Sequence, residues 1–144
     1  MVAQRRDRIW IYDYMAEFRD FAVPGFLEVE NTSTGFIPFM SRVWAESRAG
    51  ISTLLLLDEI AVYGKNNLQI DHVYRLGRHK GIDIISISQR FHSLPVIVRS
   101  QTDIFHVFQV TERRDVDYLR GLVSDEVLKT IMGLNMFEYI NISL

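Results

Sequence analysis

The sequence predicts an α/β fold built on a mainly parallel sheet. Residues 51–57 form a nearly continuous apolar run, and residues 82–88 and 104–110 are further apolar-rich runs without a strict period of two, as in strands that are covered on both faces. Stretches with apolar residues at helical spacing lie between these runs. Such an alternation of strands and helices is typical of βαβ units.

Further elements are expected in the first half of the chain. Residues 8–14 are rich in β-branched and aromatic residues and predict a buried strand that ends at Asp13. Residues 26–29 predict a short strand between turns. Apolar residues at helical spacing predict helices over residues 39–48 and 67–79.

The last third of the chain is expected to hold two helices and an edge strand. Thr111 is expected to cap the first helix, and Ser124 begins a second helix that ends at Gly133. Residues 138–143 predict a final edge strand. Because the pattern contains no repeat, linker or second domain, residues 1–144 are expected to form a single domain.

The composition fits a globular domain and excludes several classes of function. The 144 residues are 48% hydrophobic, so the chain can bury a core. A formal net charge of −2 provides no global basic field for nonspecific DNA binding, so any contact with nucleic acid is expected to be local. The absence of cysteine excludes disulfides, thiolate metal sites and cysteine nucleophiles.

The sequence also bears on location. It contains no apolar run of the roughly 18–20 residues that span a bilayer. The charged residues at its start precede a strand-like segment rather than the apolar core of a signal peptide. A chain without cysteine fits a reducing compartment. We therefore expect a cytoplasmic protein with no membrane segment in this chain.

Polar side chains follow the predicted strands at the edge where open α/β sheets bind ligands. Asp13 ends the first strand, Asp58 and Glu59 follow the next apolar run, and Gln89 follows the one after it. Two adjacent carboxylates beside a dry sheet suit metal-assisted phosphoryl transfer. One can hold Mg²⁺, usually through water, while the other orients and deprotonates the attacking water. Strands also end in acidic residues simply because solvent begins there, and that interpretation stays open.

Other polar residues have the same two interpretations. Gln89 is placed to hydrogen-bond a γ-phosphate or the lytic water, or is merely exposed. Arg75 and Arg78 share one helix face, where a guanidinium can neutralise charge on a transferred phosphoryl group or simply be solvated. The four histidines show neither metal-ligand spacing nor a carboxylate partner, so we interpret them as structural or surface residues.

The order of these segments resembles the HerA/FtsK superfamily of DNA-pumping P-loop ATPases, which includes viral genome-packaging ATPases and Zot-like proteins of filamentous phage. The resemblance rests on LLLLDE at residues 54–59, GRHKGIDIISISQR at residues 77–90, and DIFHVFQV at residues 103–110 with the helix after it. RIWIYDY at residues 8–14 looks like the strand that follows the Walker A helix of that family. The resemblance implies a three-layer, RecA-like (ASCE) core with a mainly parallel sheet.

The resemblance also implies roles for individual residues. Asp58 looks like the Walker B aspartate, which holds Mg²⁺ through water. Glu59 looks like the catalytic glutamate and Gln89 like the sensor glutamine. The implied cofactors are therefore ATP and Mg²⁺.

Further implied roles concern arginines and neighbouring subunits. Arg78 is a candidate arginine finger that acts on an adjacent subunit, and Arg114 is a second candidate that would contact nucleotide. Asp13, at the end of its strand, is a further candidate for nucleotide binding. The implied partners are copies of the same chain in a homo-oligomeric ring and double-stranded DNA.

The phosphate-binding loop of this family does not occur in the 144 residues. No G-x-x-x-x-G-K-[ST] is present, and Gly64-Lys65 is followed by Asn66 with no upstream glycine at the right spacing. That loop supplies the amides and the lysine that bind the phosphates, so this chain is not expected to hydrolyse ATP well alone. We expect a core without its first strand and P-loop, from a truncated or mis-started reading frame that lacks roughly 30 residues or more.

Three functions stay open. The first is an ATPase module, plausibly virus-encoded, that couples ATP hydrolysis to DNA translocation or packaging. The second is a Zot-like protein of phage assembly and export at the inner membrane. The third is a non-enzymatic, degenerate subunit that survives by packing on an intact one.

Overall fold

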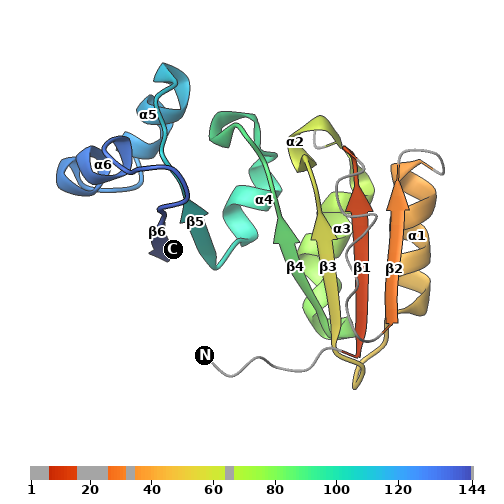
Figure 1. Ribbon diagram of the computed structural model, residues 1–144. Coiled ribbons are helices and arrows are strands. Elements are labelled where there is room, and N and C mark those ends of the chain that lie inside the picture. The colour runs from red at the N-terminus through yellow and green to blue at the C-terminus, as the bar shows by residue number, and fades with distance from the viewer. Residues whose placement is uncertain (1–6, 16–25, 32–34, 64–66, 144) are drawn as a thin grey trace.

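The computed structural model describes residues 7–15, 26–31, 35–63 and 67–143. Its main body is a four-stranded sheet in the order β2-β1-β3-β4, and each pair of neighbouring strands is parallel (Figure 1). Beside it, β5 and β6 form a two-stranded antiparallel sheet. The strands are β1 (Arg8–Asp13), β2 (Phe26–Asn31), β3 (Thr53–Leu57), β4 (Ile82–Ser86), β5 (Ile104–Val107) and β6 (Ile140–Ser143).

Helices connect the strands and pack beside them. The helices are α1 (Phe36–Glu46), α2 (Ile60–Tyr63), α3 (Leu68–Leu76), α4 (Val96–Gln101), α5 (Arg113–Arg120) and α6 (Asp125–Met132), with 3₁₀ turns at Gly77–Lys80 and Phe91–Ser93. The predicted α/β class with a mainly parallel sheet is confirmed. No helix of the described residues has the length and apolar character needed to cross a membrane.

The main core lies between one face of the parallel sheet and the helices α1, α3 and α4. Trp10 and Leu55, which are paired in register, point to this face and are almost fully buried. Phe39 of α1 and Ile70 of α3 pack against the same cluster. Burial of side chains of this size contributes about 1.5–3 kcal/mol each, so this cluster is a large contribution to the stability of the sheet.

A second, smaller core joins the C-terminal elements. Phe105 of β5, Leu119 of α5, Ile131 of α6 and Ile142 of β6 are buried in one cluster. Ser124 caps α6 by accepting a hydrogen bond from the amide of Val127, and the helix ends at Gly133, as predicted. The C-terminal helices and the β5–β6 sheet therefore have an apolar cluster of their own.

Several boundaries differ from the expectations for physical reasons. Helix α1 begins at Phe36 rather than at residue 39, because Pro38 is tolerated in a first helical turn, where its missing N–H has no intrahelical partner. The helix expected over residues 67–79 ends at Leu76 and continues as a 3₁₀ turn that Gly81 closes in the left-handed region. A Cβ at position 81 would lie 2.7 Å from the carbonyl oxygen of Ile51, so glycine is required there.

The C-terminal part departs further from the prediction. The strand expected over residues 104–110 ends at Val107 and pairs with β6, so it is not a member of the parallel sheet. The expected Thr111 cap is wrong. Glu112 caps α5, because its longer carboxylate reaches the amides of Arg114 and Asp115 at 3.1 and 3.2 Å.

Candidate functional site

The carboxyl ends of β1, β3 and β4 meet at one edge of the parallel sheet, at the top of Figure 1. The chain that leaves β3 is held from both sides by backbone hydrogen bonds. The amide of Asp58 donates to the carbonyl of Tyr12 at 3.0 Å, and the amide of Ile60 donates to the carbonyl of Ile87 at 3.0 Å. The positions of Asp58 and Glu59 are therefore fixed by main-chain contacts to both neighbouring strands.

Asp58 is a buried carboxylate with an unused oxygen. Its side chain is 6% exposed, and Oδ2 has no hydrogen-bond partner among the described residues. An ionised carboxylate in such a position is costly unless a cation, or water bound to a cation, compensates its charge. Hard oxygen ligands of this kind are those that Mg²⁺ prefers. Asp58 therefore fits the metal role that the sequence predicted.

Glu59 holds an unusual backbone conformation. Its φ of 47° lies in the left-handed region, which residues other than glycine rarely adopt. Such a conformation costs of order 1–3 kcal/mol, and strain of this kind clusters at functional sites. Because α2 begins at the next residue, the turn at Glu59 lies between the end of a buried strand and the start of a helix.

An aromatic neighbour of Asp58 was not predicted from the sequence. Tyr63 stacks on Phe36 with ring centroids 4.5 Å apart. Burial raises the pKa of the Tyr63 phenol, and a hydrogen bond with Tyr12, together with electrostatic interactions with Tyr12, Tyr14 and the Asp58 carboxylate, raises it further. The phenol of Tyr63 therefore stays protonated and uncharged near the Asp58 carboxylate. A tyrosine in a helix of one turn carries no periodic signal by which to find it.

Two further predicted residues lie at the same edge. Asp13 ends β1, is fully buried and is engaged by the surrounding structure. Gln89 follows β4 and is exposed. The structure therefore brings together Asp13, Asp58, Glu59 and Gln89 at strand ends, as the sequence predicted.

The two candidate arginines lie apart from these residues. Arg78 precedes β4, at the opposite end of the sheet, where its side chain is 82% exposed and its Nη2 lies 3.4 Å from Oδ2 of Asp103. Arg114 is exposed in the first turn of α5, outside the parallel sheet. Within one chain, Arg78 is not brought together with the carboxylates at the other edge.

A cleft of about 840 Å³ separates β4 from β5. Residues 82–89 line one side and residues 101–110 line the other. Gln89 therefore borders both the strand-end edge and this cleft. Exposed apolar side chains of Ile85, Ile87, Ile104 and Phe108 contribute to the lining.

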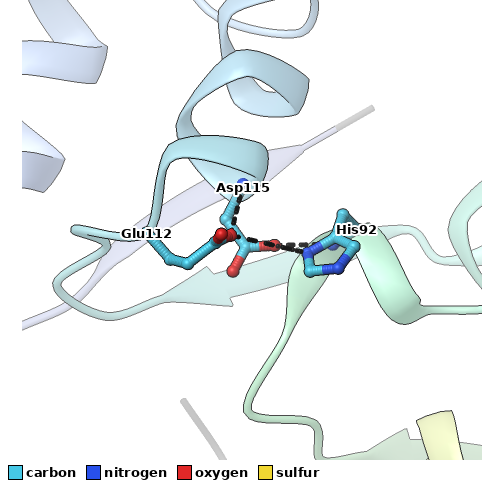
Figure 2. A group of neighbouring side chains, drawn as sticks. All are labelled: His92, Glu112 and Asp115. Atoms are coloured by element: carbon cyan, nitrogen blue, oxygen red, sulfur yellow. Dashed lines mark hydrogen bonds and ion pairs between the residues drawn. The ribbon is translucent and has the colours of Figure 1, made fainter.

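His92, Glu112 and Asp115 form a cluster that corrects the interpretation of the histidines (Figure 2). Nδ1 of His92 lies 2.8 Å from Oδ1 of Asp115 and 3.8 Å from Oε2 of Glu112, and the amide of His92 donates to the same Asp115 oxygen at 2.7 Å. The prediction that no histidine has a carboxylate partner is wrong for His92. Its partners are far away in sequence, so no local spacing signals the contact. The cluster joins the segment after Gln89 to helix α5.

Removal of the Asp115 carboxylate should weaken this junction. Asp115 is 3% exposed, and Asp115→Ala leaves the part-buried amide of His92 without its acceptor, which should lower the free energy of unfolding by about 1–3 kcal/mol. Asp117→Ala is the matched control on the same helix, because Asp117 is exposed and pairs with the surface residues Arg113 and Arg120; its cost should stay below about 0.5 kcal/mol. Urea denaturation measures both. Equal costs would contradict a structural role for the cluster.

Comparison with solved structures identifies the fold. One match is the genome-packaging NTPase B204 of Sulfolobus turreted icosahedral virus 2, in complex with ATP-gammaS, with a TM-score of 0.77 and 21% sequence identity. The match covers 94% of this chain and 77% of the B204 chain. The chain has the fold of a viral genome-packaging NTPase. The DNA-packaging ATPase B204 of Sulfolobus turreted icosahedral virus agrees, with a TM-score of 0.76 at 18% identity over the same shares of the two chains.

The packaging-NTPase fold confirms the structural resemblance that the sequence predicted. A further B204 structure, in complex with AMP, matches 94% of this chain at 20% identity with a TM-score of 0.75. No family model matches the chain, and no curated protein does. The likeness to packaging NTPases therefore lies in the arrangement of strands and helices.

Proposed function

We propose that this chain forms the hydrolysis part of an ATPase that packages or translocates DNA. The observation that carries the proposal is the buried Asp58 carboxylate, whose Oδ2 has no partner among the described residues, at the strand-end edge of a packaging-NTPase fold. Glu59 adjoins it in a strained turn, and Gln89 follows the neighbouring strand. A site with this set of groups suits phosphoryl transfer to water.

Each residue has a distinct role in the proposed site. Asp58 would hold Mg²⁺ through water, and the ion would neutralise charge on the phosphates of ATP. Glu59 accepts the proton of the attacking water. Gln89 donates a hydrogen bond from its side-chain amide to a phosphate oxygen or orients that water. The position of the segment after β4 would then depend on whether ATP or its hydrolysis product is bound.

Arg78 fits a role between subunits. Its guanidinium lies at the edge opposite Asp58 and is almost fully exposed, so it would reach the nucleotide of a neighbouring copy rather than its own. An arginine supplied by a neighbour stabilises the charge of the transition state. The proposal therefore includes a homo-oligomeric ring, in which DNA is the partner that the ring moves. Arg114 and Asp13 stay candidates for nucleotide contact.

The proposal is tested on the protein translated from the complete reading frame, including any codons upstream of Met1, here called the extended protein. We expect the extended protein to hydrolyse ATP and to do so faster when double-stranded DNA is added. Its rate of ATP hydrolysis should exceed that of residues 1–144 alone. Arg78→Ala should lower this DNA-stimulated turnover, whereas Arg75→Ala should not, because Arg75 is held by Asp71 at 2.9 Å on its own helix. A purified extended protein that binds no ATP would instead favour a non-enzymatic subunit.

A further inference from the structure

Gln89 lies on the segment that links the parallel sheet to the C-terminal elements. β4 ends at Ser86, and the segment continues through Gln89 to the 3₁₀ turn Phe91–Ser93. At its start, the amide of Ile87 donates to the carbonyl of Leu57 at 2.9 Å. The side chain of Gln89 is exposed, so its place at the sheet edge depends on the contacts of the residues around it.

The far end of this segment is fixed to helix α5 through His92 (Figure 2). The amide of His92 donates to Oδ1 of Asp115 at 2.7 Å, and Nδ1 of the ring lies 2.8 Å from the same oxygen. An ionised carboxylate only accepts hydrogen bonds, so Nδ1 is the donor. Asp115 is 3% exposed and lies in the first turn of α5, where the helix N-terminus favours negative charge. One buried carboxylate therefore holds both the backbone and the side chain of His92.

The two residues before this histidine also contact the C-terminal elements. Phe91 packs against the rings of Phe105 and Tyr118, with centroids 5.1 and 5.3 Å apart. Nη1 of Arg90 lies 3.9 Å from Oε2 of Glu112, a weaker contact because both side chains are partly exposed. Three consecutive residues, beginning directly after the glutamine, are therefore held by β5 and by the start of α5.

We propose that His92 and Asp115 are positioning residues for Gln89. Only two residues separate His92 from Gln89 in sequence, so a fixed His92 limits how far Gln89 moves from the sheet edge. A misplacement of about 1 Å in an active site costs up to about 10²-fold in rate. His92 and Asp115 thereby act through Gln89 and not by contacting nucleotide themselves. The inference rests on the ATPase function proposed above, because that proposal assigns Gln89 to the site.

A double-mutant cycle in the extended protein separates positioning from a general loss of structure. Asp115→Ala should lower ATP turnover by about tenfold or more, because the segment that carries Gln89 loses its anchor. In protein that already carries Gln89→Ala, the same substitution should lower turnover by less than about twofold, because the group that it positions is absent. Asp117→Ala is the control on α5 and should leave turnover unchanged in both backgrounds.

His92→Ala is a second variant that perturbs folding less. It removes the bond from the ring and keeps the bond from the backbone amide to Asp115. Its loss of turnover should be smaller than that of Asp115→Ala and should also depend on the presence of Gln89. If both variants lower turnover by the same factor with and without Gln89, the inference is overturned, because such a loss indicates a general effect on structure.

A probe at position 89 tests the physical link without measuring turnover. Residues 1–144 contain no cysteine, so Gln89→Cys in the extended protein, with any cysteine of the extension replaced by serine, accepts a thiol-reactive spin label. Asp115→Ala should increase the mobility of this label, seen as a narrower electron paramagnetic resonance spectrum, and Asp117→Ala should not. An unchanged spectrum in Asp115→Ala would overturn the inference alone. Increased mobility in a protein that hydrolyses no ATP would support the link and contradict the ATPase proposal.

Discussion

Glu59→Gln in the extended protein should preserve ATP binding and reduce turnover by about 10²–10⁴-fold, the usual contribution of a general base. Glutamine keeps the size and hydrogen-bonding reach of the side chain but does not accept the proton of the attacking water. It is also a residue with a Cβ, so the strained φ of 47° is present in both proteins and does not confound the comparison. Steady-state ATPase rates and titration with a fluorescent ATP analogue measure the two quantities.

The control for this experiment is Glu126→Gln, an exposed acidic residue in the first turn of α6. It changes the net charge by the same amount and should leave turnover unchanged. Retained turnover in Glu59→Gln would remove Glu59 from the proposed chemistry. Equal loss of ATP binding and turnover would indicate that Glu59 holds the nucleotide instead of activating water, because an interaction shared by ground state and transition state alters binding.

The strained turn at Glu59 adds a stability comparison to the same experiment. Glycine adopts a φ of 47° without a steric cost, so Glu59→Gly should be at least as stable as the unsubstituted chain although it lacks the carboxylate. A strained, unfavourable residue that is kept at an active site is an instance of stability given up for function. The backbone conformation therefore supports the functional interpretation of Glu59 over that of an ordinary acidic strand end.

The central strands were predictable because their signals are local. The run before Asp58 is apolar at every position except Ser52 and Thr53, and such runs form strands covered on both faces. The carboxylates at its end follow directly in sequence, so their place at the sheet edge follows from the strand itself. The same holds for Gln89 after β4. Asp58, Glu59 and Gln89 could be predicted because they follow the strands closely in sequence.

Other features depend on contacts between distant residues, and the sequence did not indicate them. The pairing of β5 with β6 rather than with the parallel sheet is decided by which strand edges meet in space. His92 and Asp115 lie 23 residues apart and join a short 3₁₀ turn to helix α5, so neither periodicity nor spacing indicates their contact. Helix α2 has four residues and is too short to show a helical period.

Asp58→Asn should raise the stability of residues 1–144 although it removes the proposed metal ligand. The buried Oδ2 has no partner among the described residues, so neutralising the carboxylate removes an uncompensated charge and should increase the free energy of unfolding by about 1–2 kcal/mol. Asp13→Asn is the matched control, because Asp13 is also buried at a strand end but is engaged by its surroundings; it should destabilise the chain. Urea denaturation without Mg²⁺ measures both.

The effect of Asp58→Asn on stability should change from stabilising to destabilising when nucleotide and metal are present. A ligand that binds only the folded state stabilises it in proportion to the logarithm of its concentration above Kd. Mg²⁺ and ATP should therefore raise the Tm of the extended protein, and EDTA or Asp58→Asn should each abolish the part of that rise that depends on Mg²⁺. A carboxylate that binds a metal is unfavourable in the folded state until the cation is bound. If Asp58→Asn instead lowers stability without ligands and leaves the Mg²⁺-dependent rise in Tm intact, then Asp58 stabilises the fold and does not bind the metal.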